Sequence, residues 1–137
     1  MALDSARVAE TRSWLVKEAS DLRAGSHEFT ATPPLLDDIA FHAQQMVEKA
    51  LKSFLTWHDR PFRKTHDLVE LGQACVEIDP SLEPLLRGAA PLTEYAWKFR
   101  YPGDPEEPGG DEASAAFALA REVYEAVLSR LPASVRP

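Results

Sequence analysis

Five polar side chains in this sequence have the chemistry to bind an anion together. His42, Gln45 and Lys49 follow one another at spacings of three and four, so on a helix they lie along a single stripe. His66 and Arg100 add an imidazole and a guanidinium from later parts of the chain. All five offer hydrogen-bond donors, with no carboxylate nucleophile or obvious base among them. We therefore expect them to converge on one concave site that binds an anion such as a phosphate group.

Other interpretations of the same residues stay open. A polar stripe at this spacing is also the pattern of a solvated helix face. His66 would then bond to a neighbouring loop, and Arg100 would pair with an acid of the loop that follows it. The sequence has no glycine-rich phosphate loop, no paired-cysteine zinc spacing and no HExxH or GxSxG segment. We expect neither a metal site nor a cofactor.

The stripe belongs to the longest helical pattern of the chain, over residues 37–59. Its apolar positions recur at the spacing of one helix face and are Ile39, Ala43, Met46, Val47, Ala50 and Phe54. Ala40, Leu51 and Leu55 widen that face beyond a narrow seam. This breadth predicts a central helix that contacts neighbours on more than one side.

Other helices are expected on both sides of this one. Residues 3–24 form a first helix with Gly25 as its stop, and Thr32, Pro33 and Pro34 begin the central helix. A third helix starts at Thr65 or at Asp67 and ends by residues 79–80. A short turn over residues 80–88, a fourth helix over 92–99 and a final helix of about twenty residues that ends near 131 follow.

The proline and glycine residues define the remaining segments. Residues 101–110 hold three prolines and three glycines and predict a flexible acidic surface loop. Residues 132–137 are expected to be a frayed tail. The chain is thus predicted to be a single domain over residues 1–137, with its core within about 3–131. The fold is an all-α, antiparallel up-and-down bundle of four long helices plus a short one.

Composition excludes several classes of function. Twenty-two acidic against 15 basic residues give a net charge of −7, whereas a protein that holds nucleic acid through its phosphates has a basic excess. No apolar run is long enough to span a membrane, and the N-terminus lacks the pattern of a secretory signal. The single cysteine, Cys75, lies in line with core positions and closes no disulfide within the chain. We expect a cytoplasmic protein.

Three short segments carry a resemblance to a known family. They are FHAQQMVEKALKSFL at 41–55, KTHDLVEL at 64–71 and FRYPG at 99–103. In this order and with these gaps the chain resembles the HEPN family, named for a nucleotide-binding domain of higher eukaryotes and prokaryotes, over about residues 14–131. The resemblance implies a helical bundle, usually dimeric, often encoded beside or fused to a small nucleotidyltransferase.

Some HEPN proteins are metal-independent endoribonucleases that act as toxins. Their motif is an arginine, usually followed by a polar residue, and a histidine after four to six intervening positions. Arg100 is the counterpart of that arginine by its position before the last helix, but Tyr101 and Pro102 follow it and no histidine occurs after it. Arg60 and His66 satisfy the bare spacing, although Pro61 replaces the polar residue.

The resemblance and the residues together predict a non-catalytic HEPN-type module. We expect it to serve a small nucleotidyltransferase partner or to bind a nucleotide or another anionic ligand. We also expect a homodimer with its interface near the second and last helices, because the central helix has more apolar width than a lone bundle would cover. The alternative is an RNA-cleaving toxin of a toxin–antitoxin pair that uses Arg60 or Arg100 with His66; RNA is a partner only on that hypothesis.

Overall fold

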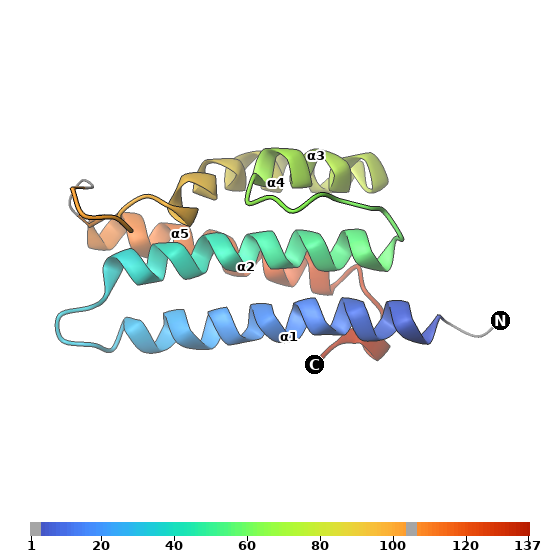
Figure 1. The fold of residues 1–137 in the computed structure, drawn as a ribbon, viewed down its shortest axis with the longest axis horizontal. Coiled ribbons are helices and arrows are strands. Elements are labelled where there is room, and N and C mark those ends of the chain that lie inside the picture. Colours follow the sequence, from blue (N-terminus) through green and yellow to red (C-terminus); the bar gives the residue numbers. More distant parts are fainter. Residues whose placement is uncertain (1–3, 104–106) are drawn as a thin grey trace.

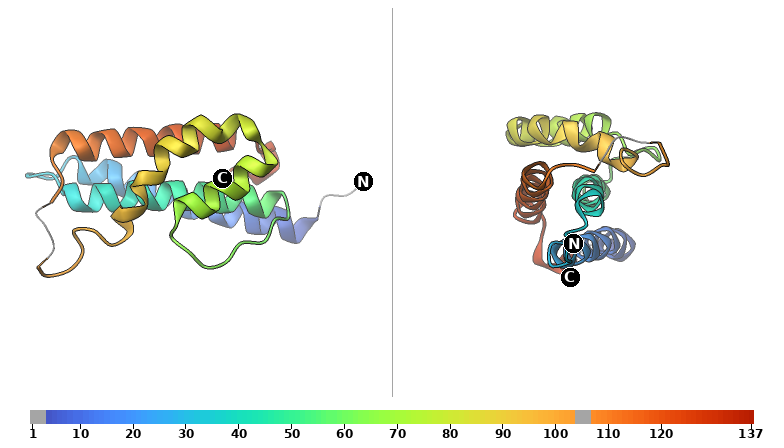
Figure 2. Two further views of the ribbon diagram at one scale, coloured as in Figure 1. Left: turned by 90° about the horizontal axis from the view of Figure 1, so that it is seen from above. Right: turned by 90° about the vertical axis from the view of Figure 1, so that its left-hand side faces the viewer.

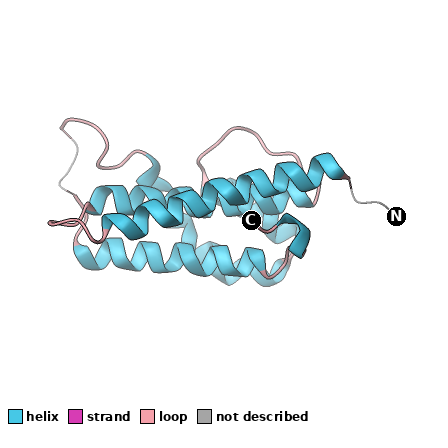
Figure 3. Ribbon diagram, turned by 90° about the horizontal axis from the view of Figure 1, so that it is seen from below, coloured by secondary structure: helices cyan, strands magenta, loops and turns pink. Residues whose placement is uncertain are grey.

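Three long helices and a layer of shorter ones make up the molecule (Figure 1). The computed structural model describes residues 4–103 and 107–137. The long helices are α1 (Ser5–Glu28), α2 (Leu36–Trp57) and α5 (Gly110–Leu128). The shorter elements are α3 (Leu68–Ile78), α4 (Glu83–Ala89) and the 3-10 helices η1 (Pro80–Leu82), η2 (Ala90–Ala96) and η3 (Ala133–Val135). The described part of the chain contains no strand (Figure 3), so the prediction of an all-α helical bundle is confirmed.

Helix α2 is the central element of the bundle. Seen from the end of the helices, it lies between α1 on one side and the layer of α3 and α4 on the other, with α5 beside it (Figure 2). All the apolar positions that define its pattern are buried, including Ile39, Met46 and Phe54 at 0–1% exposure. Burial of each large apolar side chain contributes about 1.5–3 kcal/mol. The breadth from which we expected a dimer is therefore covered within the chain.

The connection after α2 brings residues 58–67 back along that helix. Asp59 takes the left-handed conformation, with φ of 55°, and the Arg60 N–H bonds the Leu55 carbonyl at 2.9 Å, which ends α2. The chain then returns far enough for the His66 carbonyl to accept from the Gln44 side chain at 3.1 Å. Helix α3 therefore begins beside the middle of α2.

Helix α1 is longer than predicted, because Gly25 does not end it. Its last residue is Glu28, and Gly25 is buried within the last two turns. An ideal Cβ on Gly25 would overlap the Phe117 ring of α5, whose Cζ would lie 2.9 Å away. The glycine therefore serves the close approach of α1 to an aromatic side chain rather than a helix stop.

The starts of α2 and α3 were predicted with different success. Helix α2 begins at Leu36, after an N-cap Leu35 that makes no side-chain capping bond, so Thr32 and the two prolines lie in the preceding turn. The Leu35 N–H donates to the Glu28 carbonyl at 3.2 Å, and this bond joins the two ends of the connection between α1 and α2. Helix α3 begins at Leu68, and Asp67 caps it through the Val69 N–H at 2.9 Å, as its sequence predicts.

Residues 80–96 differ from the predicted turn and fourth helix. Gly88 lies inside α4, and residues 90–96 form a 3-10 helix in place of the α-helix expected over 92–99. Ala89, Leu92 and Tyr95 are buried at a spacing of three. A helix with three residues per turn keeps such a row on one face, which an α-helix would not.

The C-terminal residues also differ from the prediction of a frayed tail. Val135 in η3 is fully buried, and η3 packs against α1. The Arg136 guanidinium donates to the carbonyls of Leu128 at 2.8 Å and Leu131 at 3.3 Å. In the predicted flexible loop, residues 104–106 lie outside the described residues, and Gly110 already starts α5. Over the described ranges, no helix combines the length and apolar character needed to cross a membrane.

Candidate functional site

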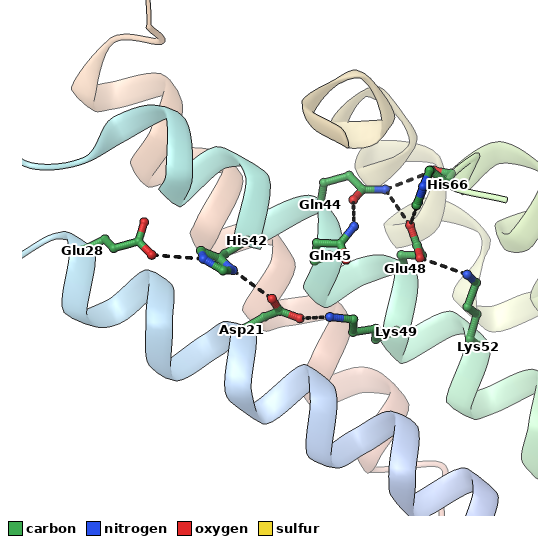
Figure 4. A network of polar contacts seen from close by, with 9 residues as sticks. All are labelled: Asp21, Glu28, His42, Gln44, Gln45, Glu48, Lys49, Lys52 and His66. Carbon is green, nitrogen blue, oxygen red and sulfur yellow. Dashed lines mark hydrogen bonds and ion pairs between the residues drawn. The ribbon is translucent and has the colours of Figure 1, made fainter. Parts of the chain in front are cut away.

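Two polar clusters flank α2 and contain four of the five residues expected to bind an anion (Figure 4). The first, which we call the Asp21 cluster, joins α1 to α2 and consists of Glu18, Asp21, Glu28, His42 and Lys49. The second, the Glu48 cluster, joins α2 to the returning connection and consists of Gln44, Gln45, Glu48, Lys52 and His66. The two clusters use similar residue types but balance their charges differently.

In the Asp21 cluster, one carboxylate of α1 bridges two cationic groups of α2. Asp21 Oδ1 lies 2.8 Å from His42 Nδ1, and Asp21 Oδ2 accepts from Lys49 Nζ at 2.5 Å. The other imidazole nitrogen, His42 Nε2, lies 3.0 Å from Glu28 Oε1. Because ionised carboxylates only accept, this geometry favours a doubly protonated ring. The hydrogen bond to Asp21 raises the pKa of His42, against an opposing effect of burial.

Glu18 is the unusual member of this cluster. Its side chain is fully buried, and among the residues that the structure describes neither carboxyl oxygen has a hydrogen-bond partner. Burial, followed by the nearby charge of Asp21, raises the pKa of Glu18 well above its ordinary value, while Lys49 acts in the opposite direction. Burial likewise raises the pKa of Glu28, whose Oε2 also lacks a hydrogen-bond partner in the described part of the chain. Three carboxyl groups thus share two cationic partners.

In the Glu48 cluster, one buried carboxylate receives three donors. Glu48 Oε1 accepts from Gln44 Nε2 at 3.1 Å and lies 2.7 Å from His66 Nδ1, and Oε2 accepts from Lys52 Nζ at 2.9 Å. Burial alone would raise the pKa of Glu48, but the hydrogen bonds from His66, Lys52 and Gln44 outweigh it and lower the pKa. An ionised Glu48 fixes His66 with its proton on Nδ1. The His66 side chain is 64% exposed, so much of the ring is accessible to a ligand.

Lys52 is the buried cation of the Glu48 cluster. Its side chain is 8% exposed, and its Nζ lies 5.3 Å from the centre of the Trp14 ring and 5.9 Å from that of Phe62. The ring faces and Glu48 together replace the water that the ammonium group loses on burial. Lys52 therefore stabilises the charge of Glu48 rather than presenting its own charge to solvent.

Arg100 lies apart from both clusters. Its Nη1 donates to Asp38 Oδ1 at 2.9 Å, and its guanidinium carbon lies 4.2 Å above the centre of the Phe41 ring. The structure therefore brings His42 and Lys49 together through Asp21. It connects Gln45 to the Glu48 cluster through a 2.7 Å bond to Gln44. Within the described ranges, the hydrogen bond and ion pair of Arg100 go to Asp38 and to neither cluster.

The helix start near residues 65–67 offers fewer free donors than expected. The Asp67 N–H is taken by the Thr65 hydroxyl at 3.0 Å, the Leu68 N–H by the Thr93 hydroxyl at 3.1 Å, and the Val69 N–H by the Asp67 carboxylate. These bonds use the backbone groups that an anion would otherwise contact.

Arg60 and His66, the pair of the ribonuclease alternative, lie along different parts of α2. The Arg60 backbone N–H donates to the Leu55 carbonyl, and the Arg60 guanidinium forms an ion pair with Glu77 at 2.7 Å. His66 is held at Glu48, seven residues earlier in α2, which corresponds to about 10 Å of helix. Each of the two side chains thus has its own carboxylate partner.

The acidic residues of both clusters were not among the predicted site residues. A signal for them exists, because Glu18, Asp21, Gly25 and Glu28 follow each other on α1 at spacings of three, four and three. Asp21 and Glu28 are seven residues apart, as are His42 and Lys49, so an antiparallel helix pair matches them. In α2, Gln44, Glu48 and Lys52 have the spacing of four that brings side chains together.

The fold and the clusters define a class: a small helical bundle with a polar seam on each side of its central helix. Residues 11–131 match the family model of the HEPN domain. The match covers most of the chain, and the protein belongs to the HEPN family. No curated protein and no solved structure gives a significant match.

Proposed function

We propose that this protein is a non-catalytic HEPN-type binding module for a nucleotide or a similar anionic ligand. The observation that carries the proposal is the alignment of two exposed donors on one face of α2. Arg100 stacks on Phe41 and His66 bonds Glu48. Phe41 and Glu48 are seven residues apart, so the two donors are separated by about two helical turns, roughly 10 Å. A nucleotide, with its base and phosphate at opposite ends of a sugar, has a suitable length.

The charge partners of these donors are compatible with ligand binding. Asp38, which holds Arg100, is 40% exposed, and an exposed ion pair of this kind contributes only about 0–1 kcal/mol. A phosphate group can therefore replace it on the guanidinium fork. On the helix, Gln45 lies between the face that carries Phe41 and Glu48 and the face that carries His42 and Lys49. Its side-chain amide adds a further polar group to the proposed site. His42 and Lys49 would take part only if the ligand displaced Asp21.

The proposal is tested by titrating the protein with ATP, AMP and inorganic phosphate in a calorimeter. Arg100→Ala and His66→Ala should each weaken binding by about 1.5–3 kcal/mol, or roughly 10- to 150-fold, the loss expected for a charge-assisted hydrogen bond. Arg121→Ala, at an exposed arginine of α5, is the control and should bind as the parent protein does. Absence of saturable binding, or equal affinity in all three variants, would contradict the proposal.

Partnership is a second part of the proposal and rests on family membership. A homodimer with its interface near α2 and α5 is tested by light scattering over a range of concentrations; the mass of one chain at high concentration contradicts it. A small nucleotidyltransferase encoded beside this protein is the proposed second partner. Co-purification of the two chains supports that assignment, and separate elution at micromolar concentrations argues against it. The cytoplasm remains our expected location.

The Glu48–His66 pair is the specific feature that favours the second candidate, a metal-independent endoribonuclease. A histidine held by a buried carboxylate is well suited to proton transfer. Against this function, Arg60 is about 10 Å from His66 along α2 and is bound to Glu77. Incubation of the protein with single-stranded RNA in a chelator tests it. Cleavage that is lost in both His66→Ala and Arg60→Ala supports the ribonuclease, and intact RNA excludes it.

A further inference from the structure

Helix α1 attaches to the rest of the protein through an unusually polar surface. Its buried residues are Thr11, Leu15, Glu18, Asp21 and Gly25, of which only Leu15 is a large apolar side chain. The helix packs mainly against α2 and η3 and forms the outer edge of the bundle (Figure 2). Val8 and Leu22 are partly buried against the core, and the ion pairs of the Asp21 cluster add a second set of contacts that hold α1 on α2.

The charges of this cluster do not balance when every group is ionised. Three carboxylates from α1, at Glu18, Asp21 and Glu28, would then face two cations from α2, at His42 and Lys49. Both cations are already bound to Asp21, and His42 is also bound to Glu28. One additional proton makes the cluster neutral, and the carboxyl group without a partner is the one that takes it.

The groups around Glu18 make it the site of that proton. Asp21 faces it from α1, Lys49 from α2 and the Tyr124 phenol from α5. Lys49 is the one cation among these three groups, and its Nζ lies 2.5 Å from Asp21. At the other end of the cluster, Glu28 faces His42, Asp37 and Asp38 of α2. An ionised Glu18 would thus be buried beside Asp21 with no hydrogen-bond donor among the described residues.

We propose that protonation of Glu18 controls the docking of α1, so that loss of this proton to solvent at rising pH loosens α1 from α2 and uncovers His42 and Lys49. The device does not depend on the proposed ligand, because it concerns the attachment of one helix. Three groups together determine whether the docking of α1 strengthens or weakens as pH rises. The pKa values of Glu18, Glu28 and His42 are all raised in the folded protein. Each therefore stabilises the docked state at low pH and loses that effect as pH rises through its folded-state pKa.

Hydrogen exchange measured by mass spectrometry tests the proposal on the intact protein. Exchange in α1 and α5 is compared at about pH 5.5 and about pH 8.5, after correction for the intrinsic pH dependence of exchange. Protection of α1 should fall about tenfold more than that of α5 for each unit by which the pKa of Glu18 is raised. In Glu18→Gln, which cannot ionise, this difference between the helices should shrink. Glu125→Gln, at an exposed position of α5, should behave as the parent protein does.

Either of two hydrogen-exchange outcomes would overturn the proposal. One is α1 protection in the parent protein that follows α5 at both pH values. The other is an equal loss of protection in the parent protein and in Glu18→Gln. If the buried amide prevents folding, Glu18→Leu is the second variant, because an apolar side chain of similar size needs no donor. Carbon-13 NMR of the Glu18 carboxyl group in the parent protein provides an independent readout; titration of that group in the range of ordinary glutamates also refutes the proposal.

Discussion

The two clusters beside α2 use the same kinds of side chain but respond to pH in opposite directions. In the Glu48 cluster one carboxylate has three donors, and the pKa of Glu48 is lowered. In the Asp21 cluster three carboxyl groups share two cationic side chains, and the pKa values of Glu18 and Glu28 are raised. Burial acts in the same direction on all three acids. The number of donors available to each carboxyl group therefore decides the direction of its shift.

The same contrast separates α1 from α5. The buried residues of α5 are all apolar and are Ala113, Ala116, Phe117, Ala120, Val123 and Val127. Helix α1, which packs against α2, buries Glu18 and Asp21. Apolar contacts are insensitive to protonation, whereas contacts between carboxyl groups and cations are not. We therefore expect the attachment of α1, but not that of α5, to depend on pH.

The largest expected effect is at Glu48. Replacement Glu48→Ala leaves the Lys52 ammonium buried without its carboxylate and removes a partner of Gln44 and His66. Loss of one member of a buried ion pair costs about 3–5 kcal/mol. The free energy of unfolding from urea denaturation measures it. Glu70→Ala, which removes an exposed pair with Arg63, is the control and should cost less than about 1 kcal/mol; similar losses in both variants would show that Glu48 is not a special position.

A smaller effect is expected where α1 meets α5. Gly25→Ala introduces a Cβ that overlaps the Phe117 ring, and that ring is 4% exposed and packs edge-on against Phe29. Overpacking of this kind costs about 1–3 kcal/mol. The matched change is Gly88→Ala in α4, where the new Cβ would meet open space. It should stabilise the protein by about 0.5–1 kcal/mol. Thermal denaturation measures both changes. A higher melting temperature for Gly25→Ala than for Gly88→Ala would contradict the close packing of Gly25 against the Phe117 ring.

The acid side of the stability profile tests the Glu48 half of the comparison. Because the pKa of Glu48 is lowered, its contribution is fully present above the unfolded value of 4.5 and is lost as pH falls through the folded-state pKa. Urea midpoints should therefore fall less steeply in acid for Glu48→Gln than for the parent protein. The pKa of Asp79 is also lowered, by hydrogen bonds from Ser81 and Arg130. Asp79→Asn is therefore the control that measures the part of the acid-induced loss of stability that Asp79 causes. If the urea midpoint of Glu48→Gln falls with pH as steeply as that of the parent protein, Glu48 does not have the proposed lowered pKa.

The smallest effect on stability is expected at Arg100. Its pair with Asp38 joins two side chains that are 33% and 40% exposed, and such pairs contribute about 0.2–1 kcal/mol. Arg100→Ala should therefore unfold almost as the parent protein does in urea. A loss of several kcal/mol would assign Arg100 a structural role and would weaken its place in the proposed ligand site.

Much of the fold could be predicted because it depends on local patterns. The apolar positions of α2 are buried as their spacing predicts, and Asp67 caps α3. Cys75 is the small core residue that its alignment with Leu71 indicates: it is fully buried, and burial raises its pKa to about 12. Gly25 and residues 90–96 were not predicted correctly, since both depend on contacts with distant segments. A local signal cannot distinguish a glycine that ends a helix from one that admits a neighbouring ring.

The candidate site divides in the same way. The spacing of His42, Gln45 and Lys49 is a property of the sequence, because any helix over these residues aligns them. The contacts of these side chains depend on the tertiary structure. Asp21 binds both His42 and Lys49. Glu48 orients His66, and Arg100 lies over the Phe41 ring. Each of these contacts joins residues at least 18 positions apart. Helical periodicity determines which side chains share a face, whereas the packing of the helices determines which charges meet and which carboxyl group remains without a donor.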